Sequence, residues 1–400
     1  MEYAPSQKIL DNYAKVLVNF ALNSGRGVKR GDVVRLIVNE SAKPLYVALR
    51  NQLLRSGAHP ITSFYPDNVD RAYFELADDS ELKFFPGKYF KGLADEIDHS
   101  IGIISETDKH ELEGINPSKI MLAQKSRKLF RDWLDVKENA GKFTWTLALY
   151  GTEAMAKEAG MTLKEYWDQI IRACFLDEPD PISKWREVFK KNTEILSQIN
   201  LLPIEKLHVE AGKIDLWITL GEKRKWLGGS GRNIPSFEVF TSPDWRGTNG
   251  HIEFNQPLYR YGSLITGIKL DFKDGIVIKS SADQNYRVLK AMLEVDNADK
   301  IGEFSLTDKR LSKIDRFMAE TLFDENISGP FGNTHLALGT AYDDTYTGNL
   351  KTLTPVLKAR LGFNNSAIHT DIISTEDRTV TALLTNGMQK VIYQNGQFTF

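Results

Sequence analysis

The sequence predicts a two-domain protein in which an α/β domain is followed by an α+β domain. Three observations support this fold class. The chain has 400 residues, and two or three domains are expected because one domain takes roughly 100–200 residues. In the first half, short apolar runs alternate with stretches of helical periodicity, which indicates a mainly parallel sheet with flanking helices. From about Lys206 the apolar residues recur with period two, which is typical of mainly antiparallel sheet.

The clearest strand of the first half is the apolar run VVRLIV at residues 33–38. It is short and rich in β-branched residues, as expected of a parallel strand that is buried on both faces. Residues 41–54 follow with apolar side chains at helical spacing, and Gly57 then provides a helix stop signal. Three further strands are predicted, at residues 60–65, 99–105 and 143–149.

A helical region closes the first half of the chain. Thr162 and Glu165 have the spacing of a capping box, which predicts a helix over residues 166–173. A proline-containing break follows, and helical periodicity resumes over residues 183–200 until Pro203.

The second half is predicted to be antiparallel sheet with inserted helices. Apolar and polar residues alternate over residues 214–220. Residues 268–272 and 276–278 flank the dipeptide Asp274-Gly275, which is a strong hairpin signal. Asn-Gly pairs near the C-terminus repeat this signal, and the main inserted helix is expected at residues 312–322.

The change of periodicity defines the predicted domain boundary. We place it near Pro203, with an N-terminal α/β domain at residues 1–203 and a C-terminal domain at residues 204–400. The C-terminal domain is expected to carry the candidate metal-binding residues.

Composition excludes several classes of function. With 51 basic and 53 acidic residues the net charge is -2, which argues against a nucleic-acid binder that works through bulk charge. The single cysteine, Cys174, rules out an internal disulfide and fits a reducing compartment. The first residues lack the basic end and apolar run of a signal peptide, and no stretch is apolar enough to span a membrane. We therefore expect a cytoplasmic protein with no membrane or nucleic-acid partner.

Familiar catalytic motifs are incomplete in this chain. His110-Glu111 begins like the HExxH signature but lacks its second histidine, and His251 lacks the PCxxC partner of a deaminase zinc site. The glycine-rich segment 228–231 lacks the GK[ST] ending of a phosphate-binding loop. Because the next residues, 234–241, have the pattern of a strand and not of a helix, we interpret the glycine-rich segment as a turn.

Two histidines have neighbours that indicate metal chemistry. His369 and Asp371 are two positions apart on a strand-like stretch, so their side chains project from the same face. His335 begins a short apolar strand between glycines. Imidazoles and carboxylates are the ligands that zinc and similar divalent ions take, and two ions sharing a carboxylate can activate water for hydrolysis. The alternative is that both histidines are structural residues.

Several sequence blocks occur in order along the second half: 233–241 (NIPSFEVFT), 301–303 (IGE), 323–327 (FDENI), 332–339 (GNTHLALG), and 364–371 (NNSAIHTD). These blocks resemble those of M29 metalloaminopeptidases of the aminopeptidase T and aminopeptidase S type, and the resemblance extends over nearly all 400 residues. Tyr342 comes seven residues after His335, as the active-site tyrosine of that family does. Separate blocks in the same order are more specific than any one of them.

The resemblance implies a set of site residues and an activity. It implies two divalent ions, zinc or cobalt with magnesium or manganese as alternatives, held by Glu238, Glu303, His335, His369 and Asp371. It implies a homodimer that releases N-terminal residues from peptides with a free N-terminus, by attack of a water activated by the two metals.

Within that implied mechanism, individual residues have expected roles. Glu303 or Asp371 would bridge the two ions, and Tyr342 would hydrogen-bond to the developing oxyanion. Glu303 or Glu238 would carry the proton to the leaving amine.

The chain departs from the family pattern at two places. Pro330 lies five residues before His335, where many members have a glutamate that has been considered a further ligand, and Phe237 replaces a residue that is often glycine. Two alternatives to the peptidase remain at this point. One is a dinuclear metal hydrolase that acts on a non-peptide substrate such as a phosphoester, and the other is a non-catalytic α/β binding protein.

Overall fold

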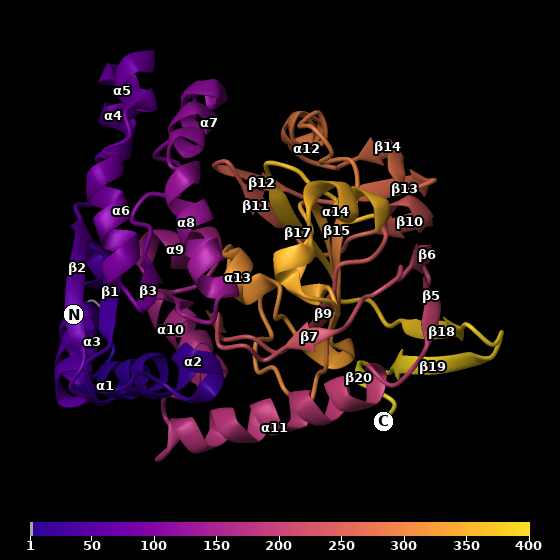
Figure 1. Cartoon of the computed structure of the whole chain (residues 1–400), viewed down its shortest axis with the longest axis horizontal. Helices are drawn as coiled ribbons and strands as arrows, with labels where there is room; N and C mark the ends of the chain where they lie inside the picture. Colours follow the sequence, from indigo (N-terminus) through magenta and orange to yellow (C-terminus); the bar gives the residue numbers. More distant parts are fainter. Residues whose placement is uncertain (1–2) are drawn as a thin grey trace. The chain divides into compact units, whose positions relative to one another are not determined.

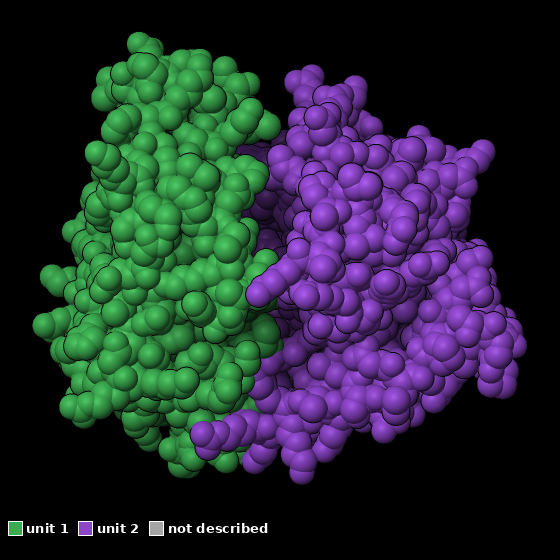
Figure 2. Space-filling model, viewed as in Figure 1, with its two compact units in different colours: residues 1–185, 230–235 green, residues 186–229, 236–400 purple. Residues whose placement is uncertain are grey.

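The computed structural model describes residues 3–400 and contains two compact units, coloured green and purple in Figure 2. Unit 1 comprises the described residues up to Trp185 and the short segment Ser230–Pro235, and unit 2 comprises Arg186–Gly229 and Ser236–Phe400. The units divide within helix α11 (Pro181–Ile199), whereas the antiparallel strands begin after it at β5 (Ile204–Ala211). A domain boundary near Pro203 therefore stays a prediction.

Unit 1 is built on a five-stranded parallel sheet of order β2-β1-β3-β4-β8. Three of its strands, β1, β2 and β3, are labelled in Figure 1. Its strands are β1 (Val33–Asn39), β2 (His59–Tyr65), β3 (His99–Ile104), β4 (Thr144–Leu149) and β8 (Asn233–Ile234). The first four confirm the predicted strands. The fifth comes from the distant segment at 233–234, so the strand predicted over residues 234–241 is in fact divided between this sheet and one in unit 2.

Helices alternate with the strands of this sheet, as the predicted fold class requires. They are α1 (Gln7–Val16), α2 (Leu22–Gly25), α3 (Lys43–Arg55), α4 (Asp70–Leu76), α5 (Asp79–Lys83), α6 (Gly87–Glu96), α7 (Pro117–Ser126), α8 (Lys128–Asn139), α9 (Glu153–Glu158) and α10 (Leu163–Ala173). The capping box at the start of α10 forms as predicted, with the amide of Glu165 donating to Thr162 Oγ1 at 3.2 Å and the amide of Thr162 donating to Glu165 Oε2 at 2.9 Å.

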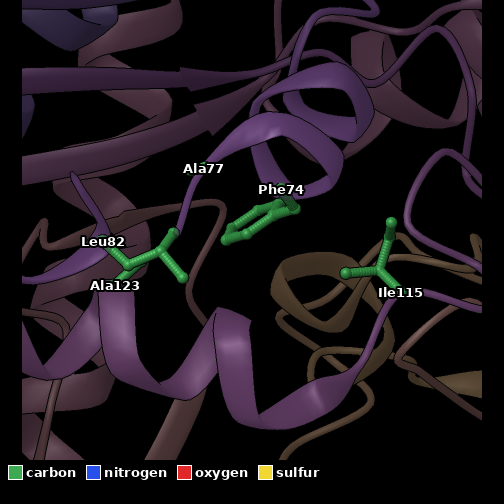
Figure 3. Packing of buried hydrophobic residues seen from close by; sticks show 5 residues of the cluster. All are labelled: Phe74, Ala77, Leu82, Ile115 and Ala123. Atoms are coloured by element: carbon green, nitrogen blue, oxygen red, sulfur yellow. The ribbon is translucent and has the colours of Figure 1, made fainter. Parts of the chain in front are cut away.

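A small apolar cluster packs the region of α4, α5 and α7 (Figure 3). Its buried members are Phe74, Ala77, Leu82, Ile115 and Ala123. Lys119, on α7, donates from Nζ to the carbonyl oxygens of Phe74 and Ala77 at 2.7 and 2.8 Å. These bonds satisfy carbonyl groups that the end of α4 leaves unpaired, and so fasten α4 to α7.

Unit 2 contains two antiparallel sheets, as predicted from its period-two pattern. The larger has eight strands in the order β14-β13-β10-β6-β5-β18-β19-β20. Besides β5, these are β6 (Ile214–Thr219), β10 (Asn249–Glu253), β13 (Lys269–Lys273), β14 (Ile276–Ser281), β18 (Thr379–Leu384), β19 (Gln389–Gln394) and β20 (Gln397–Phe398). The turns at Asp274-Gly275, Asn386-Gly387 and Asn395-Gly396 join neighbouring strands, which confirms the predicted hairpins.

The smaller sheet of unit 2 has the order β17-β16-β15-β9-β7, and all of its pairs are antiparallel. Its strands are β7 (Leu227–Gly228), β9 (Glu238–Thr241), β15 (Ile301–Thr307), β16 (Asn333–Gly339) and β17 (His369–Ser374). A short hairpin of β11 (Leu258–Arg260) and β12 (Ser263–Ile265) and the helices α12 (Tyr286–Leu293), α13 (Thr321–Asp324) and α14 (Pro355–Arg360) complete the unit. The mixed fold class predicted from the sequence is confirmed.

The helix predicted at residues 312–322 is wrong. Only Thr321–Asp324 is helical there, and the preceding residues are irregular although Leu311, Ile314 and Met318 are buried at helix-like spacing. Side chains replace the helical hydrogen bonds, because Asp324 accepts from the amides of Met318 and Glu320 at 2.6 and 3.0 Å. Such local side-chain to backbone bonds compete with a helix and favour a turn.

Among residues 3–400, no helix has both the length and the apolar character needed to cross a membrane.

A candidate dinuclear metal site

The smaller sheet of unit 2 brings the five predicted ligands together. Glu238 begins β9, Glu303 lies in β15, His335 lies in β16, and His369 and Asp371 lie in β17. Residues paired across antiparallel strands lie on the same face, and so do residues two apart on one strand.

The register of the four strands explains why these side chains converge. Glu303 pairs with Ala337, which in turn pairs with Asp371. His335 is two positions from Ala337, and His369 is two positions from Asp371. Glu238 pairs with Thr307, which is four positions from Glu303. All five side chains therefore project from one face of the sheet.

The residue before Glu303 on strand β15 is Gly302, and this position requires glycine. The register of β15 with β16 shifts between Ile301 and Glu303. A Cβ atom on Gly302 would lie 2.3 Å from the carbonyl oxygen of Thr340, which no side chain can tolerate. The Gly-Glu pair of this block is thus explained by close packing of the backbone next to the site.

The potential ligand atoms form two groups that share one residue. The first contains Glu238, Glu303 and His335, and the second contains Glu303, His369 and Asp371. Within each group the ligand atoms lie within 4.8 Å of one another. Glu303 belongs to both groups, which is the position of a carboxylate that bridges two ions.

His335 is the centre of the first group. Its Nε2 atom lies 3.2 Å from Glu303 Oε1 and 3.4 Å from Glu238 Oε2. The side chain is 0% exposed, and its Nδ1 atom is buried without a hydrogen-bond partner. Although burial alone lowers the pKa of His335, hydrogen bonds to Glu238 and Glu303 and the charge of Asp371 raise it well above its ordinary value.

His369 is the most exposed of the five, with 18% of its side chain accessible. Nδ1 lies 2.9 Å from the carbonyl oxygen of Thr340, so Nδ1 carries the proton and donates it there. Nε2 then faces Asp371 Oδ1 at 3.3 Å and Glu303 Oε2 at 3.6 Å. Burial lowers the pKa of His369, but the charge of Asp371 and its hydrogen bond outweigh this effect and raise the pKa to about 9.

The carboxylates respond to the same environment. Burial raises the pKa of Glu303 to about 7, with a further contribution from the charge of Glu238. Burial also raises the pKa of Asp371, but the charge and hydrogen bond of His369 and the charge of His335 outweigh it and hold the pKa at about 2. Ionisable side chains with so little access to water are stable only when nearby opposite charges compensate for the loss of hydration.

The donor set therefore fits divalent cations. Three carboxylates and two imidazoles, with one imidazole orientated by a backbone carbonyl, match the ligands and the supporting hydrogen bonds of known metal sites. The residues predicted from the sequence as metal ligands are the ones that the structure gathers, and their binding of metal stays a proposal.

Tyr342 lies next to this cluster, as the sequence resemblance implied. Its ring is centred 4.8 Å from that of His369 and 5.7 Å from that of Phe240. Its amide donates to Ser242 Oγ at 2.8 Å, which anchors the backbone after β16. The residue is 39% exposed. Loss of solvation around the phenol, together with the charges of Glu303 and Asp371, raises the pKa of Tyr342 well above its ordinary value.

Glu325 is a site residue that sequence reasoning missed. It is buried just after α13. Burial raises the pKa of Glu325 well above its ordinary value, and the charges of Glu238 and Asp371 raise it further. Its Oε1 atom accepts from Asn326 Nδ2 at 3.4 Å, and Asn326 Oδ1 accepts from the amide of Phe237, the residue before Glu238. Glu325 therefore lies on the side of the site that carries Glu238.

The reason that Glu325 was missed is its spacing in the chain. The family pattern has a glutamate five residues before the histidine, and here that position is Pro330, which is exposed. Glu325 precedes His335 by ten positions, and the intervening segment includes the short turn Gly329–Phe331. The sequence signal was present in the block FDENI, but only the fold shows that the longer spacing still returns the carboxyl to the site.

Phe237 and Asn326 connect the two acidic segments of the site. Phe237 is 0% exposed, so its ring packs in the interior. Its amide donates to Asn326 Oδ1 at 2.7 Å. Asn326 also donates from Nδ2 to the carbonyl oxygen of Leu322 at 3.1 Å. These bonds tie the start of the strand that carries Glu238 to the turn that carries Glu325.

A buried cluster of carboxylates and imidazoles that forms two ligand groups defines this unit as a candidate metal-dependent hydrolase. The profile of the family described as thermophilic metalloprotease (M29) matches residues 6–398, so the chain belongs to this family. Membership confirms the resemblance seen in the sequence and the predicted class of metal-dependent peptidase. It also confirms the expectation that divalent metal is used.

Named relatives cover nearly the whole chain. Aminopeptidase PepS of Streptococcus thermophilus is 28% identical over an alignment 414 positions long, which covers 97% of each protein. Aminopeptidase T of Thermus thermophilus is 27% identical over 408 residues, covering 96% of this chain and 97% of that protein. Among solved structures, wild-type AmpT from Thermus thermophilus covers 98% of this chain and 100% of that chain with a TM-score of 0.85 at 23% identity, which shows a shared fold.

Proposed function

We propose that this protein is an aminopeptidase that releases N-terminal residues from peptides with the help of two divalent ions. The observation that carries the proposal is the double ligand group in which Glu303 is shared. The names of the relatives support the peptide substrate, because each is called an aminopeptidase.

Each of the gathered side chains has an assigned part in holding the metals. Glu238 and His335 would hold one ion, His369 and Asp371 would hold the other, and Glu303 would bridge both. Two bound ions supply an activated water and a positive charge for the oxygen of the scissile carbonyl. Zinc and cobalt remain our preferred ions, with magnesium and manganese as alternatives.

Two residues outside the ligand groups complete the chemistry. Tyr342 keeps its proton at neutral pH, since the ordinary pKa of a tyrosine is about 10 and the site raises it further. Its hydroxyl can therefore donate a hydrogen bond to the oxygen that becomes negative during attack. The leaving amine needs a proton from a nearby acid. Glu325 suits this task better than Glu303 or Glu238, because it belongs to neither ligand group and burial raises its pKa well above its ordinary value.

Assembly and location belong to the same proposal. We propose a homodimer that works in the cytoplasm on peptide substrates with a free N-terminus. Light scattering during size-exclusion chromatography would measure the assembly directly, and a monomeric mass at micromolar concentration would exclude the homodimer.

Removal and return of metal tests the proposed function. Dialysis against a chelator is expected to abolish hydrolysis of aminoacyl-p-nitroanilides and of leucyl peptides, and zinc or cobalt should restore it, because the cluster needs the ions to activate water. Elemental analysis should find about two ions per chain. Hydrolysis of p-nitrophenyl phosphate but not of peptides would favour the phosphoester alternative. A chain that retains no metal after exposure to zinc would contradict both.

The pKa values predict that metal uptake depends on pH. His369, with a pKa of about 9, and His335, with a pKa raised well above its ordinary value, are protonated in the metal-free protein at pH 7. Glu303, with a pKa of about 7, is protonated in part. A metal must displace these protons, so affinity should rise between about pH 6 and pH 9. Calorimetry in buffers of different ionisation enthalpy would measure the protons released, and uptake without release would contradict this assignment.

A further inference from the structure

A positively charged side chain lies beside the candidate metal site without a carboxylate partner. Arg260 ends strand β11, which lies against β17, the strand that carries His369 and Asp371. Its Nη2 atom lies 3.5 Å from the carbonyl oxygen of His369, which is the nearest hydrogen-bond acceptor that the guanidinium has. Within residues 3–400, no ion pair joins Arg260 to an aspartate or glutamate.

Most of the hydrogen-bonding capacity of this guanidinium is unused. Its Nε atom is buried and has no hydrogen-bond partner. The ring of Tyr261 is centred 5.1 Å from the guanidinium carbon. A guanidinium offers five N–H donors in a fork that matches the two oxygens of a carboxylate. The partly buried guanidinium of Arg260, with its Nε donor unpaired, can therefore bind an anion from another molecule.

The position of Arg260 relates this anion site to the metal cluster. Arg260 contacts the backbone of His369, which is the most exposed of the gathered ligands and so the one most accessible to a substrate. The charge of Arg260 is also felt at Asp371, in the same group. An anionic group bound by Arg260 would thus belong to a molecule whose other end reaches the metal cluster.

We propose that Arg260 binds a carboxylate of the peptide substrate on the leaving side of the scissile bond, which makes dipeptides with a free C-terminus the preferred substrates. This inference rests on the proposed aminopeptidase function. In a dipeptide the α-carboxylate belongs to the residue that follows the scissile bond. It could accept hydrogen bonds from two N–H groups of Arg260 while the first carbonyl lies at the metal cluster. The side chain of a glutamate in the same position is the other source of a carboxylate.

Three peptides that differ in one group distinguish these sources. The metal-loaded protein is assayed with leucyl-leucine, with leucyl-leucinamide, and with leucyl-glutamic acid α-amide. We expect the wild type to cleave leucyl-leucine with a kcat/KM about tenfold or more above that of leucyl-leucinamide, because a charge-assisted bidentate bond is lost in the amide. If kcat/KM were highest with leucyl-glutamic acid α-amide, the group bound by Arg260 would be a side-chain carboxylate and not the α-carboxylate.

Variants of Arg260 assign the preference to this residue. In Arg260→Gln the kcat/KM with leucyl-leucine should fall to about that with leucyl-leucinamide, so the preference for the free acid disappears. Arg260→Lys should keep part of the preference, since it keeps the charge but loses the fork. Arg287→Gln, the same substitution at an exposed arginine of α12, is the matched control and should behave as the wild type.

The outcomes separate this inference from the proposed function. Equal rates with acid and amide in the wild type would overturn the inference and leave the aminopeptidase intact. An equal loss with all three peptides in Arg260→Gln would overturn it too, because it would show a structural role. No cleavage of any peptide by the metal-loaded wild type would overturn the proposed function and this inference with it.

Discussion

Replacement of Glu303 by glutamine is expected to remove metal binding and peptide cleavage together. Glu303 is the residue shared by both ligand groups, and its side chain is 4% exposed. An amide cannot bridge two cations with two anionic oxygens, so both groups lose a ligand at once. We expect kcat/KM to fall by about 10³-fold or more, the order seen when the main electrostatic stabilisation of a transition state is lost. Elemental analysis and the p-nitroanilide assay would measure both effects.

The same substitution should leave the metal-free protein folded, which separates loss of function from loss of structure. Burial raises the pKa of Glu303 to about 7, so its ionised form is disfavoured in the folded state. A raised carboxyl pKa stabilises the fold at low pH, and this stability is lost as the pH rises from the unfolded pKa through the folded one. Glutamine cannot ionise, so thermal unfolding of Glu303→Gln should depend less on pH between about 5 and 8 than that of the wild type.

A matched control removes a carboxylate elsewhere on unit 2. Glu294, at the end of α12, has a side chain that is 67% exposed and only a distant pairing with Lys290 at 3.9 Å. Glu294→Gln should retain metal, activity and stability, since exposed ion pairs contribute little. If Glu303→Gln kept two ions and most of its activity, the assignment of Glu303 as the bridging ligand would be wrong.

Replacement of Glu325 by glutamine is expected to have the second largest effect, on the rate alone. Glu325 belongs to neither ligand group, so metal content should stay at the wild-type level. A glutamine is close in shape but cannot give or take the proton, so kcat should fall by about 10²–10⁴-fold, the usual contribution of general acid–base catalysis. KM should change little, because the charge of Glu325 is not required to bind the peptide.

Measurement of kcat, KM and metal content in one preparation tests this role. Glu294→Gln again serves as the control for loss of a carboxylate. Loss of metal in Glu325→Gln would show that Glu325 is a ligand and not a proton carrier. An unchanged kcat would show that it is only a buried neighbour of the site.

The elements that were predicted well are those whose signal is local. Parallel strands between two layers of helices are mostly apolar, and so residues 33–38 and 143–149 were recognisable. The turns at Asp274-Gly275 and Asn395-Gly396 were recognisable because few residue pairs form such tight turns. The helix expected at residues 312–322 failed because its apolar spacing serves an irregular buried segment held by the side chain of Asp324.

The fold class, the family resemblance and the chemical nature of the five predicted ligands could all be predicted before the structure was known. Those properties depend on residue type and on short spacings, which a chain displays before it folds. Only the tertiary structure shows that Glu303 is shared by both ligand groups, that Glu325 is joined through Asn326 to the segment of Glu238, and that Arg260 has a buried Nε atom without a hydrogen-bond partner. These facts depend on strand register and on close approach between segments far apart in the chain, and no local pattern of residues encodes either.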